Sequence, residues 1–393
     1  MLPIGFQYSG ATGGIKESGK PDIAIISSDV PAVAAGVYTQ NIVRAASIDW
    51  NRKITPTDGF KAVVVNSGNA NACTGNVGHE NNQQMATLTA NALAAAPENI
   101  CVMSTGVIGH QLPMDCVETG IATAAQNLGS QLADFEAASQ AILTTDQGNK
   151  TAFRSFEIQG KTIRLAGMAK GAGMIGPNMA TMLGIVTTDA KLSAADAQKV
   201  LQHAADHSFN CISVEGHTST NDSLVLMSNG QSEALLQDEE SIQLFSNQLT
   251  ELCIELATQI PADGEGATHL IQINVSGAGS DADADTVARA VAMSNLVKTA
   301  IAGADPNWGR ITSATGLTSV QFDISQLSVS INGTSIFAAG QPVEFGEKEL
   351  SQNMASNFET LLDIQIGAGV GKATHWTSDL NEAYVKFNSE YTT

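Results

Sequence analysis

The sequence has few aromatic and few basic residues. Aromatic side chains make up 5% of the 393 residues, and 19 Lys and Arg stand against 39 Asp and Glu, which gives a formal net charge of −20. A surface with this charge repels nucleic acids and anionic membranes, so we expect neither as a partner. Hydrophobic residues still reach 43%. The chain is therefore long and apolar enough for two or three packing units with an aliphatic core.

Cysteine, histidine and long apolar runs are also too few or too scattered for several classes of protein. The five cysteines include no CxxC pair, which is typical of reduced thiols in a cytosol rather than of a disulfide framework. The seven histidines form no HExxH motif and no Cys/His pairing, so we expect no metal site. No stretch is long enough for a membrane span, and the start "MLPIGFQYSG" does not resemble a signal peptide. We therefore expect a cytoplasmic protein.

Strand and helix patterns alternate irregularly along the chain. Strand patterns begin at Phe60, Asn99, Ile185, Ser223 and Thr268, and helix patterns cover residues 81–96, 193–209, 240–259 and 284–303. Ser193 with Asp196 three residues later predicts a capped helix start, and Asn332-Gly333 predicts a hairpin turn. This irregular order favours a layered α+β architecture over a doubly wound parallel sheet.

The stretch "KGAGMIGPNMATMLGIVTTDA", residues 170–190, places Thr181 between a glycine-rich loop and a β-branched run. Its glycines happen to match the G-x-G-x-x-G spacing of dinucleotide-binding loops. Pro177 and the strand pattern that follows stand where such a motif needs a helix, so we reject a dinucleotide site. Thr181 either starts the strand or serves as a nucleophile.

A nucleophilic Thr181 needs a base. A threonine at the start of a chain can use its own α-amine, which titrates near pH 8, but Thr181 is internal. This route therefore requires cleavage of the Ala180–Thr181 bond, through attack of the Thr181 hydroxyl on the carbonyl of Ala180. It also requires an oxyanion site, for which "STGVIG" (residues 104–109) is a candidate because Gly106 allows close approach to a backbone N–H. Alternatively, this motif is only a strand-ending turn.

Blocks in the same order span nearly the whole chain and resemble one known family. Besides the stretch around Thr181, they are "SDVPAVAAGVYTQN", "VVVNSGNANACTG", "STGVIG", "ILTTD", "FNCISVEGHTSTND", "DGEGATHLIQINVSGA", "LVKTAIAGADPNWGR" and "YVKFNSEYTT". The sequence resembles the ornithine acetyltransferase (glutamate N-acetyltransferase) family of arginine biosynthesis.

The resemblance implies a self-cleaving precursor. Cleavage before Thr181 gives an α chain (1–180) and a β chain (181–393), which remain together, typically as a heterotetramer of two α and two β chains. The implied fold has stacked sheets flanked by helices, similar to N-terminal-nucleophile hydrolases, with a C-terminal α/β subdomain from about 282 to 393. The implied reaction moves acetyl from N2-acetyl-L-ornithine to L-glutamate by a ping-pong mechanism without a cofactor. Some members also use acetyl-CoA, which makes it a candidate co-substrate.

The resemblance also assigns roles to residues. Thr181 matches the nucleophile, and Thr105 and Gly106 match the oxyanion hole. The positions that match substrate-binding residues are Thr144, Lys170, Thr181, Glu265, Asn388 and Thr393. A cation such as Lys170 suits an α-carboxylate, and Glu265 suits the δ-ammonium of acetylornithine. Without the resemblance, Lys170 is equally compatible with a solvated strand-end cation and Glu265 with a turn carboxylate.

Two positions depart from the family. His217 stands where many members have an acid, and Thr392 stands where many have Arg before the last hydroxyl residue. An alternative function is an amidase or aminopeptidase that uses the same Thr nucleophile and releases the acyl group to water. A third hypothesis is a non-catalytic scaffold that keeps only the fold.

Overall fold

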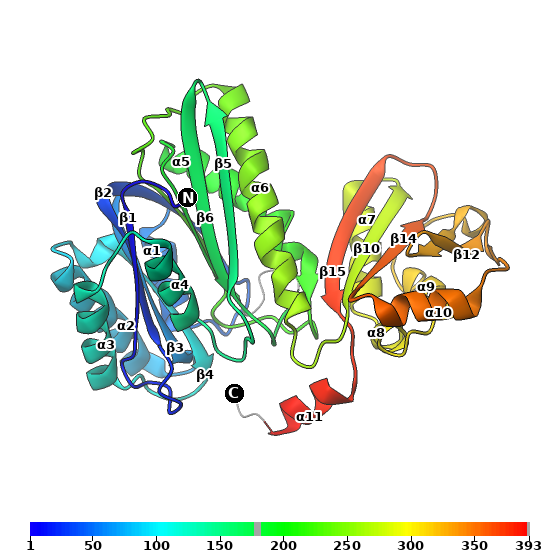
Figure 1. Ribbon diagram of the computed structural model, residues 1–393, viewed down its shortest axis with the longest axis horizontal. Coiled ribbons are helices and arrows are strands. Elements are labelled where there is room, and N and C mark those ends of the chain that lie inside the picture. Colours follow the sequence, from blue (N-terminus) through cyan, green and yellow to red (C-terminus); the bar gives the residue numbers. More distant parts are fainter. Residues whose placement is uncertain (177–181, 391–393) are drawn as a thin grey trace.

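The computed structural model describes residues 1–176 and 182–390, and Ala180, Thr181, Thr392 and Thr393 lie outside them. It contains an eight-stranded and a seven-stranded mixed sheet with flanking helices, so the predicted α+β class is confirmed (Figure 1). The first sheet has the order β4-β3-β2-β9-β7-β6-β5, with β1 paired to β2. The second has the order β13-β12-β11-β14-β10-β15-β8.

The strands of the first sheet alternate in direction in an irregular way. Their bounds are β1 Phe6–Ala11, β2 Ile23–Tyr38, β3 Thr57–Asn69, β4 Ile100–Val107, β5 Lys150–Ile158, β6 Lys161–Lys170, β7 Leu183–Thr188 and β9 Ser223–Ser228. β3 runs parallel to β4 and β7 parallel to β9, whereas the other pairs are antiparallel. All six residues of β7 are buried, as expected for an apolar strand covered on both faces.

The long strand β2 divides the first sheet into two packed layers. Its register shifts between Ser27 and Ala32, and its two halves pair mainly with β3 and β9, respectively. One apolar core contains Ile26 of β2 and Val63 of β3, from the half of the sheet on the β3 side. The same core contains Met168 of β6 and Ile185 of β7, from the half on the β9 side. The two halves of the sheet therefore face each other across this core, which gives the stacked arrangement expected from the resemblance.

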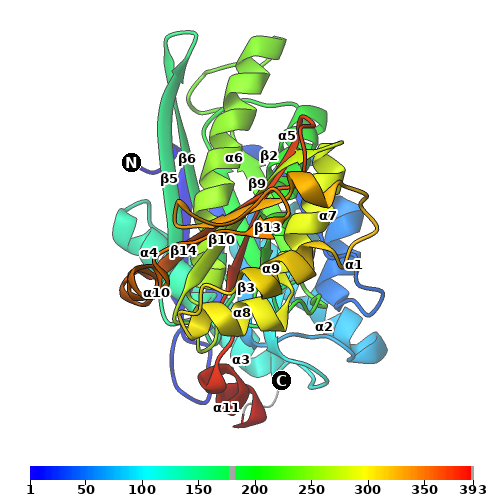
Figure 2. The same ribbon diagram turned by 90° about the vertical axis from the view of Figure 1, so that its right-hand side faces the viewer.

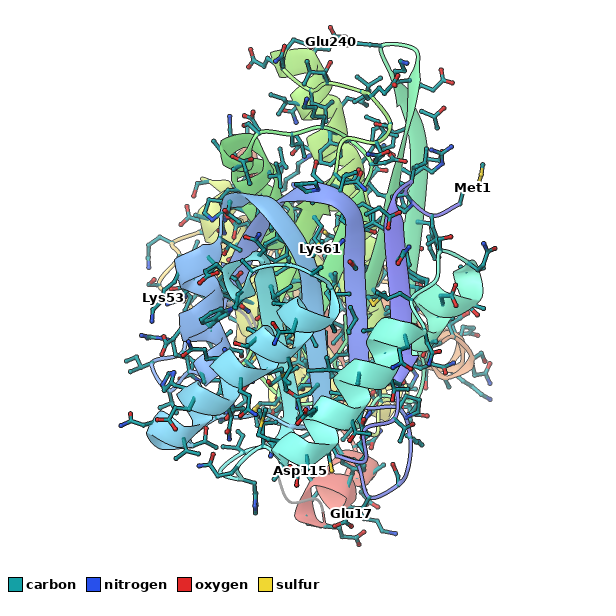
Figure 3. The ribbon with its side chains drawn as sticks, turned by 90° about the vertical axis from the view of Figure 1, so that its left-hand side faces the viewer. Met1, Glu17, Lys53, Lys61, Asp115 and Glu240 are labelled. Atoms are coloured by element: carbon teal, nitrogen blue, oxygen red, sulfur yellow. The ribbon has the colours of Figure 1, made fainter. Side chains whose placement is uncertain are left out.

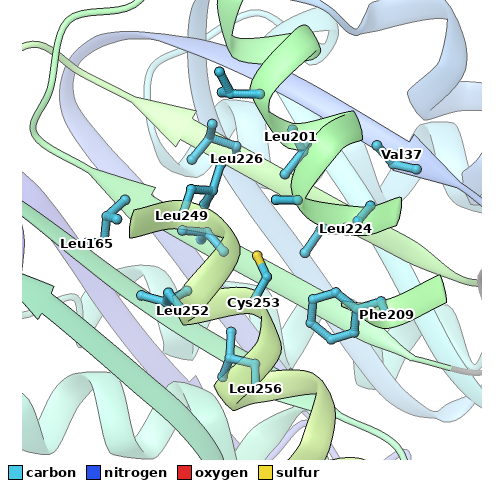
Figure 4. Close-up of a cluster of buried hydrophobic side chains, with 14 of the residues drawn as sticks. Val37, Leu165, Leu201, Phe209, Leu224, Leu226, Leu249, Leu252, Cys253 and Leu256 are labelled. Carbon is cyan, nitrogen blue, oxygen red and sulfur yellow. The ribbon is translucent and has the colours of Figure 1, made fainter. Parts of the chain in front are cut away.

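Helices cover both outer faces of this stack. α2 (Gly75–Ala92) and α3 (Met114–Gln126) cover one face (Figure 3), and α5 (Ala194–Asp206) and α6 (Glu239–Ala262) cover the other. Leu249, Leu252 and Leu256 of α6 lie among the buried side chains of the second face (Figure 4). The remaining helices beside this sheet are α1 (Ala46–Ile54) and α4 (Leu132–Ala141). No helix among the described residues is long and apolar enough to span a bilayer.

The second sheet lies on the far side of α6, which also contacts β8 and β15 (Figures 1 and 2). Its strands are β8 Ile212–Ser213, β10 Leu270–Ala278, β11 Ser328–Ile331, β12 Thr334–Ala338, β13 Gln341–Pro342, β14 Glu359–Gln365 and β15 Gly371–Ser378. Its helices are α7 Asp281–Ala292, α8 Asn295–Ala302, α9 Trp308–Thr315 and α10 Glu347–Ser356. The hairpin between β11 and β12 turns at Asn332-Gly333, both with positive φ, as predicted.

One predicted helix is wrong. The stretch 284–303 does not form a single helix, because α7 ends at Ala292 and α8 begins at Asn295. The hydroxyl of Ser294 accepts a hydrogen bond from the backbone N–H of Val297, so Ser294 caps a new helix rather than continuing the first. The predicted cap at Ser193 is confirmed, since its hydroxyl accepts from the N–H of Asp196. A C-terminal subdomain from about 282 stays a prediction.

After β15 the chain returns to the first sheet. Its last described helix, α11 (Glu382–Glu390), lies near the lower edge of both sheets in Figure 1. A Cβ on Gly266, whose φ is +76°, would lie 2.5 Å from the backbone nitrogen of Tyr384. Only glycine allows this close approach, which holds the start of α11 against the loop after α6.

Candidate active site

A cavity of about 220 Å³ lies where β4 and β6 end and α11 closes over them. It brings together six residues that the sequence predicts for the site: Thr105, Gly106, Thr144, Lys170, Glu265 and Asn388. His217, one of the two departures from the family, also lines it. The predicted nucleophile Thr181, its neighbour Ala180 and the predicted contact Thr393 lie outside the described residues.

The end of β4 is held very close to the end of β3. Gly68 pairs with Gly106, and a Cβ on Gly106 would lie 2.3 Å from the carbonyl carbon of Gly68. The φ of Gly106 is +132°, a conformation that side chains rarely adopt. Position 106 therefore requires glycine, and the backbone of Thr105 and Gly106 forms a fixed part of the cavity.

Asn221 ties this turn to the neighbouring loop, a role that the sequence did not reveal. Its side-chain amide donates to the carbonyl oxygens of Ala70 at 2.6 Å and Ser104 at 2.8 Å. Its own oxygen accepts from the hydroxyl of Thr220 at 2.5 Å. Asn221 is buried at 4% exposure, so these bonds satisfy polar groups that water does not reach. The polar run "TSTND", residues 218–222, is the sequence feature that could have indicated this role.

Lys170, the last residue of β6, is a buried cation. Its exposure is 2%, which excludes a solvated strand-end lysine. Its Nζ donates to the hydroxyl of Thr105 at 3.3 Å and lies 4.0 Å from a carboxylate oxygen of Asp146. Burial lowers the pKa of Lys170, and nearby Lys150 adds to this, whereas Asp146 acts in the opposite direction. Among the described residues, Lys170 therefore makes no ion pair shorter than 4.0 Å, so its ammonium group is available to an anionic ligand.

Asp146 organises the floor beneath Lys170. It accepts hydrogen bonds from the backbone N–H groups of Gly171 at 2.6 Å and Thr144 at 3.0 Å, and from Lys150 at 2.7 Å. Burial alone would raise its pKa, but Lys170 and Lys150 hold the pKa of Asp146 below its usual range. Lys150 also contacts Asp263 at 2.6 Å. This network fixes Thr144 and connects the first sheet to the loop that carries Glu265.

Glu265 lies against the loop that directly follows β6. Its N–H donates to the carbonyl of Ala172 at 2.9 Å, and its carboxylate accepts from the side-chain amide of Asn388 at 3.0 Å. A Cβ on Gly173 would lie 2.3 Å from a carboxylate oxygen of Glu265. Glycine at position 173 therefore makes room for this carboxylate beside the loop.

Glu215 is a second carboxyl of the cavity, which the sequence did not single out. Both of its oxygens are shielded from water and make no hydrogen bond with described residues. Burial raises the pKa of Glu215 to about 7, and Glu265 adds to the rise. The backbone N–H groups of Ile175 and His217 partly offset this rise in the pKa of Glu215, although neither meets the geometry of a hydrogen bond. Tyr384 of α11 lies nearby, and burial with both carboxylates raises its pKa to about 12.

The described residues on both sides of 177–181 contact segments that line the cavity. Just before position 177, a Cβ on Gly176 would lie 2.4 Å from the carbonyl carbon of Gly216. Just after position 181, the N–H of Met182 donates to Asp222 at 2.9 Å. Asp222 is fully buried, which raises its pKa well above the usual range. Gly176 and Met182 therefore both lie against segments that line the cavity.

A group that could hold a metal ion lies elsewhere in the part of the chain that the structure describes. Cys211, Asp285 and His375 bring potential ligand atoms within 4.8 Å of one another. Asp285 already pairs with His375 at 3.1 Å and Arg289 at 3.2 Å. Neither Cys211 nor His375 belongs to the cavity lining.

Comparison with known proteins identifies the family. The family model of the ArgJ family matches residues 7–393. The chain belongs to the ArgJ family. The predicted resemblance is thereby confirmed, and full-length relatives agree. The "arginine biosynthesis bifunctional protein ArgJ" of Rhodopirellula baltica is 46% identical over 100% of this chain and 97% of its own. The protein of the same name from Symbiobacterium thermophilum is 45% identical over 100% and 98%.

Two solved structures each match about half of this chain. The "arginine biosynthesis bifunctional protein argJ" of Bacillus halodurans is 36% identical with a TM-score of 0.51, and the match covers 52% of this chain and 97% of that one. An "ornithine acetyltransferase complexed with ornithine" from Mycobacterium tuberculosis is 35% identical with a TM-score of 0.41, covering 45% of this chain and 93% of that one. The solved Bacillus chain is thus about half as long as the present chain.

Proposed function

We propose that this ArgJ protein transfers acetyl from N2-acetyl-L-ornithine to L-glutamate in arginine biosynthesis, through an acetyl-Thr181 intermediate. One observation carries the proposal: a single cavity holds a buried cation, a glycine-dependent turn and a carboxylate, beside both ends of the segment that contains Thr181. These are the groups needed to hold an α-carboxylate, an oxyanion and an ammonium.

The nucleophile arises by self-cleavage. The Thr181 hydroxyl attacks the carbonyl carbon of Ala180, the peptide C–N bond breaks, and the nitrogen becomes the free α-amine of Thr181. Water then hydrolyses the resulting ester and leaves a carboxylate on Ala180. The products are chains 1–180 and 181–393. The half-length chain of the Bacillus relative, which is covered at 97%, supports this division.

In the first half-reaction the Thr181 hydroxyl attacks the acetyl carbonyl of acetylornithine. The α-amine of Thr181 takes the hydroxyl proton and passes it to the departing α-amine of ornithine, so the amide becomes an ester on Thr181. The backbone turn at Thr105 and Gly106 stabilises the negative charge on the carbonyl oxygen. Loss of one such donor typically costs about 10²–10³ in rate.

In the second half-reaction the α-amine of glutamate attacks the acetyl ester. Lys170 and Thr144 hold the α-carboxylate that both substrates share, while Glu265, positioned by Asn388, holds the δ-ammonium of the donor. Thr393 is proposed as a further substrate contact, and this role follows only from the resemblance to the family. Transfer to glutamate exceeds hydrolysis if the acceptor amine is placed correctly and water is excluded.

The alternative is a hydrolase that forms the same acyl-enzyme and releases acetate to water. Acetate release measured with and without glutamate separates the two functions: acetyl transfer predicts acetylglutamate in place of acetate when glutamate is present. Intact-mass measurement of the same preparation should show two chains divided before Thr181. A working enzyme with an uncut chain would refute the α-amine mechanism.

We also propose three further properties, which follow from the resemblance to the family. They are a heterotetramer of two α and two β chains, a cytoplasmic location, and acetyl-CoA as a second donor. The word "bifunctional" in the names of the relatives supports a second donor. Direct comparison of acetylornithine and acetyl-CoA, with glutamate as the acceptor, tests it.

A further inference from the structure

Glu215 is a buried carboxyl of the cavity that none of the roles above uses. It follows β8 and lines the cavity together with Glu265 and Tyr384. Its two oxygens have no hydrogen-bond partner among the described residues and are shielded from water. A buried carboxylate without partners is costly, so the charge of Glu215 depends strongly on what else occupies the cavity.

Charged and titratable groups face Glu215 from several elements. Glu265 comes from the loop after α6, Lys298 from α8, Tyr384 from α11 and His217 from the same loop as Glu215. Lys298 is bound by the carbonyl of Val214 and the hydroxyl of Thr377, so it does not act as a hydrogen-bonded partner of Glu215. A pKa of about 7 for Glu215 follows mainly from burial and the proximity of Glu265.

The proposed reaction presents this cavity with an electrostatic problem. In a ping-pong reaction the same site receives the side chain of ornithine, which is a cation, and the side chain of glutamate, which is an anion. A carboxylate such as that of Glu265 attracts the first and repels the second. A carboxyl that gains and loses a proton near neutral pH can suit both.

We propose that Glu215 is a specificity-determining carboxyl that is ionised when the ornithine side chain is bound and protonated when the glutamate side chain is bound. This inference rests on the proposed function. Binding of the cation releases the proton of Glu215 to solvent, and binding of the anion takes one up from solvent; only the O–H bond changes. Nearby positive charge favours the carboxylate and nearby negative charge favours the acid, so each side chain induces the charge that suits it.

The test compares two donors across pH. The specificity constants kcat/KM of acetylornithine and acetylglutamate are measured from pH 6 to 8, and their ratio is taken. Groups that act on both donors alike, including the α-amine of Thr181, cancel in this ratio. In the wild type the ratio should rise about tenfold or more with pH, since ionised Glu215 favours the cation. In Glu215→Gln it should stay constant.

Two further variants separate Glu215 from its neighbours. His217 also lines the cavity, so its contribution has to be separated from that of Glu215. His217→Gln should retain the rise. Glu265→Gln should lower the ratio at every pH and move the rise to lower pH, because Glu265 helps to raise the pKa of Glu215. A constant ratio in His217→Gln, or a persistent rise in Glu215→Gln, would overturn the inference.

A measurement on the wild type keeps the inference falsifiable if Glu215→Gln does not fold. Calorimetric titrations at pH 7, in buffers of different ionisation enthalpy, count the protons exchanged on binding. Ornithine should release protons and glutamate should take them up; equal proton counts would refute the role of Glu215. A wild type that transfers acetyl from neither donor refutes the proposed function, whereas an active wild type with a constant ratio refutes only the role of Glu215.

Discussion

Two walls of the cavity differ in how tightly the chain holds them. The strand-end wall (Thr105, Lys170 and Asn221) is buried at 2–4% exposure, and hydrogen bonds connect it to β4, to β6 and to Ala70 directly after β3. The carboxylate wall (Glu215, Glu265 and Asn388) comes from loops and α11. It has one hydrogen bond between its members, and Glu215 has none among the described residues.

The difference matches what the two proposed substrates share and what they do not. Acetylornithine and acetylglutamate have the same acetyl amide and α-carboxylate, and their side chains carry opposite charges. A rigid wall suits the shared part, because the oxyanion and the α-carboxylate need fixed partners in both half-reactions. A less constrained wall suits the part that changes. The variants below should therefore affect both donors alike on one wall and unequally on the other.

The largest effect is expected at Thr181, which is the proposed nucleophile for both donors. Thr181→Ala removes the hydroxyl that cleaves the chain and accepts acetyl, so it should give one uncut polypeptide without activity towards either donor. Intact mass and acetyl transfer are measured on the same preparation. Thr181→Ser, which keeps a hydroxyl, should still be cut. Cleavage of Thr181→Ala would refute self-processing by this residue.

Lys170→Met tests the strand-end wall. It replaces the buried cation with an apolar side chain of similar length, and hydrogen bonds to charged groups contribute about 1.5–3 kcal/mol. We expect kcat/KM to fall roughly 10- to 100-fold, and by a similar factor for acetylornithine and acetylglutamate. A loss confined to one donor would show that Lys170 contacts the side chain rather than the shared α-carboxylate.

The sequence predicted the class of fold, and it singled out two of the three residues of each wall. Strands such as β7 and β9 contain short apolar runs and are fully buried, and Gly106 marks a close backbone approach. The sequence did not indicate Glu215 or Asn221. The role of Glu215 depends on burial, and that of Asn221 depends on partners far away in the chain, such as Ala70. The break between α7 and α8 was not predicted, because the helical pattern of the sequence is continuous there and only the cap at Ser294 starts a new helix.

Asn221→Ala should loosen the strand-end wall without removing a charge. The carbonyl oxygens of Ala70 and Ser104 would lose their buried donor, which costs about 1–3 kcal/mol for each group left unsatisfied. We expect the free energy of unfolding to fall by about 2 kcal/mol, measured from the shift of the urea midpoint. Residual activity should fall equally for the two donors. An unchanged midpoint would mean that Asn221 does not hold the turn.

The smallest effect is expected at Asn388, on the carboxylate wall. Its amide donates to Glu265 at 3.0 Å from an exposed position on α11, and a hydrogen bond of this kind contributes about 0.5–1 kcal/mol. Asn388→Ala should lower kcat/KM for acetylornithine about two- to fivefold and leave acetylglutamate unchanged. Ser389→Ala is a matched control, because among the described residues the hydroxyl of Ser389 donates to the backbone carbonyl of Lys386 within the same helix. An equal loss for both donors in Asn388→Ala would indicate that α11 closes the whole cavity, and the contrast between the walls would then fail.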